Sequence, residues 1–213
     1  MGKYQAVIFD LDGVICFTDK YHYQAWKAVA DELGVYFDET INNRLRGVSR
    51  MDSLEIILER YDGHLTDDQK IAIAEKKNAL YRELLQNMSP DDLSGEVKAT
   101  LDALRAGGLK LAIGSSSKNT RFILSQLGLY GFFDAISDGT NITRSKPDPQ
   151  VFTMAAGFLG LDPAVCLVVE DAQAGIAAAR AGGFDSVGLG EAAACGQATY
   201  ALDCFADLTG ICL

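Results

Sequence analysis

Apolar residues follow two patterns along the chain, and the patterns predict two kinds of secondary structure. Four short apolar runs are expected to form buried strands: residues 4–9, 109–114, 165–171 and 184–190. Apolar residues at helical spacing predict helices between them: residues 96–106, 119–127, 148–160 and 174–183. Strands that alternate with helices are typical of βαβ units, so this part of the chain is predicted to form a parallel sheet.

Residues 20–86 differ, because their apolar residues recur at helical spacing alone. We expect helices at 21–34, where Gly34 is a candidate C-cap, and at 49–61 and 67–88. No apolar run in this stretch is bounded by turn residues as a strand would be. The stretch is therefore predicted to be an all-helical insert.

The predicted fold class is α/β. We expect a Rossmann-like parallel sheet core with helices on both faces, plus a small all-helical cap inserted after the first strand. Residues 1–16 and 88–213 are assigned to the core, and residues 17–87 to the cap.

The 213-residue chain has a formal net charge of −10, which disfavours nucleic acid as a partner because phosphate contacts rely on Lys and Arg. Its longest apolar runs are far shorter than the roughly 20 residues that a membrane span needs. Five cysteines without a C-x-x-C pair, and an N-terminus unlike a signal peptide, favour reduced thiols. We expect a cytoplasmic monomer that binds a small molecule, with no nucleic acid and no membrane as partner.

Polar residues lie at the carboxyl ends of the predicted strands, where parallel sheets place their sites. They are Asp10 and Asp12, Ser115, Ser116, Ser117, Lys118 and Asn119, Lys146 before a helix, and Glu170 and Asp171. Each alone can be a turn residue, a helix cap or a solvated lysine. Together, four carboxylates at one edge would repel one another without a cation. Hard oxygen ligands suit Mg²⁺ bound beside a substrate phosphate.

This order of motifs resembles the haloacid dehalogenase superfamily of phosphotransferases: D-x-D-G-V, a later Ser, Lys-Pro, and Glu-Asp. The resemblance implies that Asp10 is the nucleophile that accepts the phosphoryl group and that Asp12 is the general acid and base. It also implies that Ser115 and Lys146 hold the transferring phosphoryl group. Mg²⁺ is the implied cofactor, with these ligands: Asp10, Asp12 through its backbone carbonyl, Glu170 and Asp171.

The helical insert carries side chains with two open interpretations each. His22 and Trp26 lie four residues apart on one helix face, which suits a core or a pocket. Arg46 and Arg50 flank residues 47–49 at a predicted helix start, which suits an anion or a solvated loop with a capping serine. Lys77 suits either a ligand site or a solvated helix face.

Together, these segments resemble the cap of the bacterial β-phosphoglucomutase family. The resemblance implies a substrate-binding set: His22, Trp26, Arg46, Gly47, Val48, Ser49, Arg50 and Lys77 from the insert, and Ser117, Lys118 and Asn119 from the core. Phe17 departs from the pattern, because many relatives have Asp there, at the expected hinge.

The resemblance implies an isomerase that interconverts β-D-glucose 1-phosphate and glucose 6-phosphate. The reaction would pass through an aspartyl phosphate, with a sugar 1,6-bisphosphate as intermediate and activator. A mutase must hold two phosphates and a phosphatase only one, so a second anion site at Arg50 favours the mutase. A Mg-dependent sugar-phosphate phosphatase of the same superfamily and a non-catalytic binding protein are the alternatives.

Overall fold

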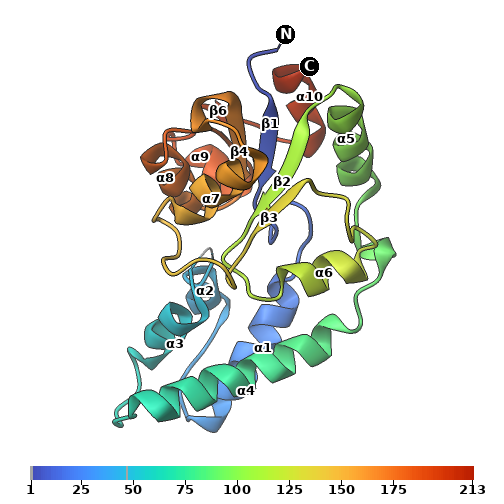
Figure 1. The fold of residues 1–213 in the computed structure, drawn as a ribbon. Coiled ribbons are helices and arrows are strands. Elements are labelled where there is room, and N and C mark those ends of the chain that lie inside the picture. Colours follow the sequence, from blue (N-terminus) through green and yellow to red (C-terminus); the bar gives the residue numbers. More distant parts are fainter. Residues whose placement is uncertain (1, 47) are drawn as a thin grey trace.

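A computed structural model describes residues 2–46 and 48–213; Gly47, one of the expected substrate-binding residues, lies outside the described residues. Six parallel strands form one sheet in the order β3-β2-β1-β4-β5-β6 (Figure 1). The strands are β1 (Ala6–Phe9), β2 (Lys110–Gly114), β3 (Ala135–Ser137), β4 (Cys166–Glu170), β5 (Asp185–Gly188) and β6 (Tyr200–Ala201). Because β1 pairs with both β2 and β4, the residues that follow β1 lie at the middle of the sheet edge.

Helices occupy most of the remaining chain. The α-helices are α1 (Asp19–Glu32), α2 (Glu39–Asn43), α3 (Arg50–Leu58), α4 (Asp67–Leu85), α5 (Gly95–Ala106), α6 (Thr120–Gln126), α7 (Gln150–Leu159), α8 (Gln173–Ala181), α9 (Gly190–Ala194) and α10 (Leu208–Cys212). Short 3₁₀ helices are η1 (Pro90–Asp92), η2 (Pro163–Val165) and η3 (Phe205–Asp207). Within the described ranges, no helix combines the length and the apolar character that crossing a bilayer requires.

The two faces of the sheet are buried under different helices. Successive strand residues point to opposite faces, so Val7 and Phe9 pack with residues of α5, α6 and α10. Ala6 and Ile8 pack on the other side with residues of α7 and α8. Every residue of β1 is buried, which explains why the strand is a continuous apolar run without alternation. The expected α/β class, with helices on both faces, is confirmed.

Short elements account for the differences from the sequence pattern. The pattern did not predict β3 and β6, because three and two residues are too few for a period of two to be recognised. The run at 184–190 was expected to be one strand, but β5 ends at Gly188 and α9 begins at Gly190. The backbone of Gly190 has a positive φ of 51°, which turns the chain out of the sheet.

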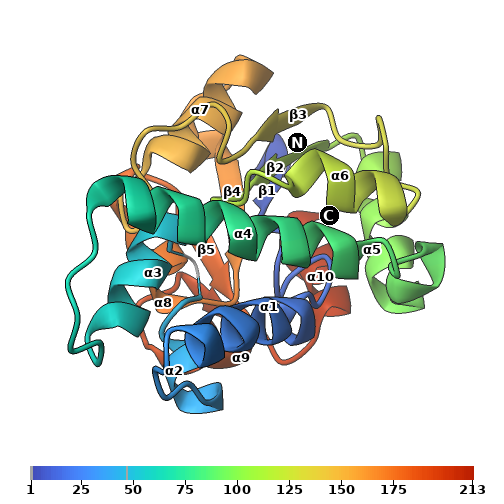
Figure 2. The same ribbon diagram turned by 90° about the horizontal axis from the view of Figure 1, so that it is seen from below.

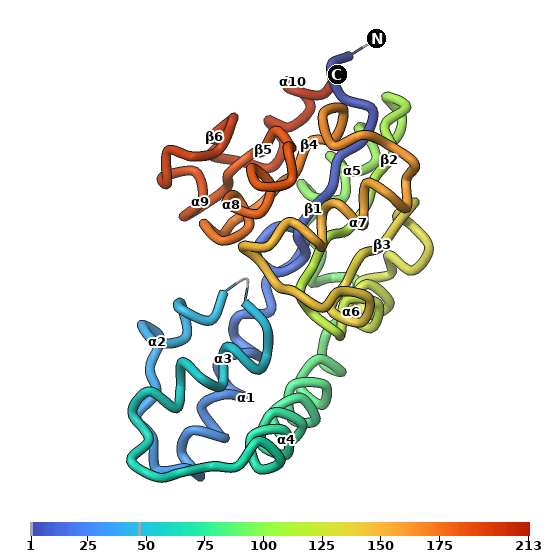
Figure 3. Tube along the Cα trace, turned by 60° about the vertical axis from the view of Figure 1, so that its left-hand side comes forward, coloured from blue at the N-terminus to red at the C-terminus, as the bar shows by residue number. Residues whose placement is uncertain are grey.

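Helices α1 to α4, which follow β1, form a group of their own at the carboxyl edge of the sheet (Figures 1 and 3). Seen from below, α1 and α4 run side by side across this edge (Figure 2). The group has its own apolar core, built by Trp26 and Val29 of α1, Ile41 of α2, Leu54 of α3 and Ala74 of α4. We therefore propose the division into a core (1–16 and 88–213) and a cap (17–87).

Candidate active site

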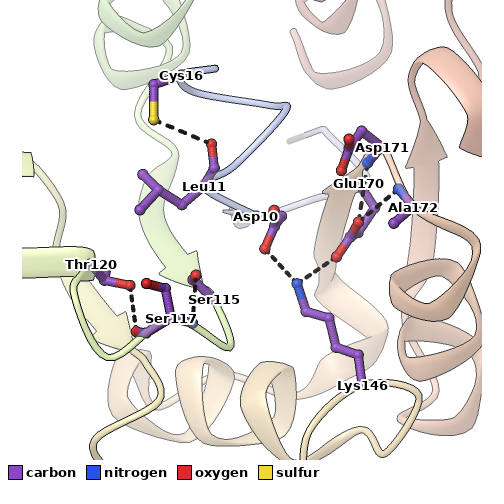
Figure 4. Close-up of polar contacts among 10 residues, drawn as sticks. All are labelled: Asp10, Leu11, Cys16, Ser115, Ser117, Thr120, Lys146, Glu170, Asp171 and Ala172. Atoms are coloured by element: carbon purple, nitrogen blue, oxygen red, sulfur yellow. Dashed lines mark hydrogen bonds and ion pairs between the residues drawn. The ribbon is translucent and has the colours of Figure 1, made fainter. Parts of the chain in front are cut away.

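The strand ends bring together side chains that are far apart in the sequence. The amide of Asp10 donates to the carbonyl of Val169 at 2.9 Å, so pairing continues one residue beyond β1. The amide of Ser115 likewise donates to the carbonyl of Ser137 at 3.0 Å. Glu170 is the last residue of β4. The side chains of Asp10, Ser115 and Glu170 therefore converge at the carboxyl edge (Figure 4).

Lys146 links two of these carboxylates (Figure 4). Its Nζ lies 2.5 Å from Oδ1 of Asp10 and also donates to Oε1 of Glu170. Burial lowers the pKa of Lys146, but the negative charges of Asp10 and Glu170 outweigh that effect and hold it above its ordinary value. Burial raises the pKa of Glu170, and Lys146 opposes this rise. The lysine is therefore charged at neutral pH and compensates the buried carboxylates.

Glu170 is held in one orientation by its own chain. Its Oε2 accepts the backbone N–H groups of Asp171 and Ala172, each at 3.1 Å. Gly175 of α8 leaves room for the carboxylate, because a Cβ at that position would lie 1.9 Å from Oε1 of Glu170. Hydrogen bonds thus fix the carboxylate, and the lack of a side chain at Gly175 leaves the space that it occupies.

Asp10, Glu170 and Asp171 form an acidic cluster that fits a divalent cation. Each offers one carboxylate oxygen, and these atoms lie within 4.8 Å of one another. Burial, reinforced by the charges of Asp10 and Glu170, raises the pKa of Asp171 to about 8. A cation would remove this repulsion, and an all-oxygen donor set suits Mg²⁺. The backbone carbonyl of Asp12 as a further ligand stays a prediction.

Asp12 receives a hydrogen bond from the start of the first cap helix. Thr18 is the N-cap residue of α1, but its hydroxyl donates to Oδ1 of Asp12 and makes no side-chain capping bond. Burial raises the pKa of Asp12 to about 7, and the charge of Asp10 adds to the rise. A carboxyl group with a pKa near neutrality can both release and accept a proton. Sequence reasoning did not select Thr18, because the helix was predicted to begin at residue 21, whereas α1 begins at Asp19.

A cavity of about 470 Å³ lies between the sheet edge and the helical group. Most of the expected site residues line it: Asp10, Asp12, His22, Trp26, Arg46, Val48, Ser49, Arg50, Lys77, Ser115, Ser117, Lys118, Asn119 and Asp171. Lys146 and Glu170 are almost completely buried and are absent from the lining. The cavity therefore joins the candidate nucleophile with candidate binding residues of the insert.

Lys77 does not belong to a solvated helix face, so that interpretation is wrong: the residue is only 2% exposed. Its Nζ lies 2.9 Å from Nδ1 of His22 and sits over the rings of Trp26 and Tyr81 at 4.9 and 4.5 Å. Burial lowers the pKa of Lys77 to about 7, and the positive charge of Arg50 contributes. The amine of Lys77 is therefore held in an aromatic wall of the cavity.

Arg50 and Asn119 meet at a residue that sequence reasoning missed. Ser49 caps α3 by accepting the N–H of Asp52 at 3.2 Å, so Arg50 is the first residue of that helix. Nη2 of Arg50 donates to Oδ1 of Asn78 at 2.7 Å, and Nδ2 of Asn119 donates to the same oxygen at 2.8 Å. Asn78 lies in α4, next to Lys77. No signal in the sequence indicated it, because its partners Arg50 and Asn119 come from distant segments of the chain.

Arg46 reaches from the loop before α3 toward the acidic cluster. Its Nη2 pairs with Asp19 at the start of α1, and its Nη1 lies 3.9 Å from Oδ2 of Asp171. Its side chain is about one-third exposed. The helical group thus brings a positive charge close to the candidate metal ligands.

A family model described as haloacid dehalogenase-like hydrolase matches residues 4–183. The chain belongs to this family. It is 40% identical over 189 residues to the β-phosphoglucomutase of Bacillus subtilis, covering 88% of this chain and 84% of the relative. It is 33% identical to the fructose-1-phosphate phosphatase YqaB of Escherichia coli, covering 87% and 96% of the two chains.

A solved structure of this family has the same arrangement. The β-phosphoglucomutase of Clostridium difficile superposes with a TM-score of 0.90 at 35% identity, covering 96% of this chain and 93% of the other. The protein is therefore an enzyme of the haloacid dehalogenase-like family. Since its relatives include both a mutase and a phosphatase, the choice between these activities depends on the site.

Proposed function

We propose that this protein is a β-phosphoglucomutase that interconverts β-D-glucose 1-phosphate and glucose 6-phosphate. The observation that carries the proposal is that Arg50, a cation of the helical group, lines the same cavity as the candidate nucleophile Asp10. A bisphosphorylated sugar needs a binding site for its second phosphate, and a guanidinium group at a helix start suits that role. The 40% identity to the Bacillus mutase supports the same conclusion.

We assign the catalytic roles to the two aspartates. Asp10 attacks phosphorus through a carboxylate oxygen and forms an aspartyl phosphate, while Asp12 protonates the departing sugar oxygen. When the phosphoryl group is transferred from Asp10 to a sugar hydroxyl, Asp12 removes the proton from that hydroxyl. Lys146 keeps its positive charge beside Asp10 and stabilises negative charge there. Mg²⁺ bound by Asp10, Glu170 and Asp171 would neutralise phosphoryl oxygens.

The remaining cavity residues serve the second phosphate and the sugar. The intermediate sugar 1,6-bisphosphate must bind in two opposite orientations, so either phosphate must fit the distal site. We assign that site to Arg50 from the cap, with Ser117, Lys118 and Asn119 from the core. Trp26, Lys77 and His22 form a wall for the sugar ring.

The test is to supply aldose 1-phosphates with Mg²⁺ and a trace of the matching 1,6-bisphosphate, and to follow isomerised product and free phosphate together. We expect glucose 6-phosphate from the β-glucose 1-phosphate anomer, with free phosphate released far more slowly. A sugar-phosphate phosphatase is the rival, favoured by the similarity to the Escherichia coli enzyme. Rapid release of phosphate without isomerisation would establish the rival and exclude the mutase.

A further inference from the structure

One side chain joins the two halves of the cavity. Asn78 projects from α4 of the helical group, and its Oδ1 accepts the side-chain N–H of Asn119, the N-cap residue of α6 beside the sheet. The same oxygen accepts Nη2 of Arg50 from α3. The distances are 2.8 and 2.7 Å, which are normal for N–H···O hydrogen bonds. The contact therefore connects three helices and spans the proposed cap–core boundary.

The chemistry of this contact resembles that of a bound anion. An amide oxygen has two lone pairs, and here both are directed at donors that come from opposite sides of the cavity. Arg50 and Asn119 are also the donors that we assign to the distal phosphate. Their convergence on one oxygen means that a phosphate oxygen at the same position would satisfy both of them.

The neighbouring residue fixes the position of Asn78. Lys77 is buried against Trp26 of α1, and its Nζ lies 2.9 Å from Nδ1 of His22 in the same helix, so this turn of α4 cannot rotate without breaking those contacts. Consecutive residues on a helix point about 100° apart, so burying Lys77 directs Asn78 to an adjacent face of α4. Asn78 lines the cavity beside Lys77.

We propose that Asn78 is a positioning residue: it holds the cap closed against the core and presents Arg50 and Asn119 to the distal phosphate. The proposal rests on the proposed function, because it assigns the distal anion to these two donors. When the substrate binds, a phosphate oxygen replaces Oδ1 of Asn78 at one or both donors. The donors are then already close to their bound positions, which lowers the cost of ordering them.

Three variants test this role. Asn78→Ala removes the acceptor, whereas Asn78→Asp keeps an acceptor oxygen and adds a negative charge. Asn43→Ala is the control, because Asn43 is an exposed asparagine of α2 that does not line the cavity. Circular dichroism and thermal melting establish that each variant is folded.

The first measurement needs no substrate. Trp26 is the single tryptophan of the sequence, is only 1% exposed and lines the cavity. Acrylamide should therefore quench its fluorescence weakly in the wild type and in Asn43→Ala. We expect at least about twofold stronger quenching in Asn78→Ala, and near wild-type quenching in Asn78→Asp. Wild-type quenching in a folded Asn78→Ala would overturn the proposal.

The second measurement separates positioning from catalysis. In Asn78→Ala, we expect KM for β-glucose 1-phosphate to rise about tenfold, while kcat falls less than about threefold. Asn78→Asp should also raise KM, because its charge repels the phosphate, although it keeps the cap closed. A change in kcat alone would contradict the role of Asn78. If the wild type releases phosphate without isomerisation but Asn78→Ala still exposes Trp26, the mutase fails and the closure role stands.

Discussion

The ammonium nitrogen of Lys146 lies 2.5 Å from Oδ1 of Asp10, and their side chains are 1% and 11% exposed. This relationship places a positive charge directly beside the candidate nucleophile, in a site where other carboxylates are also buried. It also makes the positive charge of Lys146 a structural requirement, since Glu170 shares it.

Removing that charge should cost stability as well as activity. In Lys146→Ala, two buried carboxylates lose their cation, and breaking a buried pair typically costs about 3–5 kcal/mol. Urea unfolding in the presence of a chelator measures this change. Lys98→Ala is the control, because Lys98 forms an exposed i,i+4 pair with Asp102 that is worth less than about 1 kcal/mol. Equal unfolding midpoints for the two variants would contradict the prediction.

Gly13 should be required for the acidic cluster. Its φ is +94°, and a Cβ there would lie 2.1 Å from Oδ2 of Asp171. Gly108 has a similar φ of +87°, but a Cβ there would meet nothing within 4 Å, so Gly108→Ala carries the backbone strain alone. We expect Gly13→Ala to weaken Mg²⁺ binding in calorimetry by at least about tenfold and Gly108→Ala to leave it unchanged. The idea fails if both variants bind Mg²⁺ like the wild type.

The buried amine of Lys77 should make stability depend on pH. Its pKa is lowered from 10.5 to about 7, so between these values the unfolded chain binds a proton that the folded chain does not. This group therefore makes the free energy of unfolding rise with pH across that window, by up to about 1.4 kcal/mol per unit. Lys77→Met should lose this rise between pH 7 and 9. Lys76→Met should retain it, because the neighbouring Lys76 is 54% exposed; identical pH profiles would contradict the assignment.

Arg50 should matter for isomerisation and not for a small substrate. A hydrogen bond to a charged group is worth about 1.5–3 kcal/mol, so Arg50→Ala should lower isomerisation at least roughly tenfold. Hydrolysis of acetyl phosphate leaves the distal site empty and should be nearly unchanged. Both rates are measured in matched samples. An Arg50→Ala enzyme that isomerises normally would remove Arg50 from the distal site.

Substitutions of the two aspartates should impair different steps of the reaction. Asp10→Asn lacks the nucleophile, so acid-quenched samples should contain no phosphoenzyme. Asp12→Asn keeps the nucleophile and loses general acid–base catalysis, which typically contributes about 10²- to 10⁴-fold. Transfer of radiolabelled phosphate measures phosphoenzyme formation in Asp10→Asn and the loss of rate in Asp12→Asn. Phosphorylation of the Asp10→Asn protein would show that another residue is the nucleophile.

Local sequence determined much of the sheet and the approach to the site. The apolar run of β1 could only be buried on both faces, and Asp10 and Asp12 had to follow it at the carboxyl edge. The same reasoning located Ser115, Glu170 and Asp171, because parallel strands end at one edge. These predictions succeeded because each depends on a few consecutive residues and one rule of topology.

Tertiary structure decided which polar residues face each other. Lys76 and Lys77 are indistinguishable in the sequence, yet one is exposed and the other is buried under Trp26 and Tyr81. Asn78 has its two hydrogen-bond partners because α3, α4 and α6 pack around the same cavity. Lys146 and Asp10 are 136 residues apart in the sequence. They are in contact because folding of the sheet brings their segments together. Such pairs follow from packing over long separations, which local periodicity does not encode.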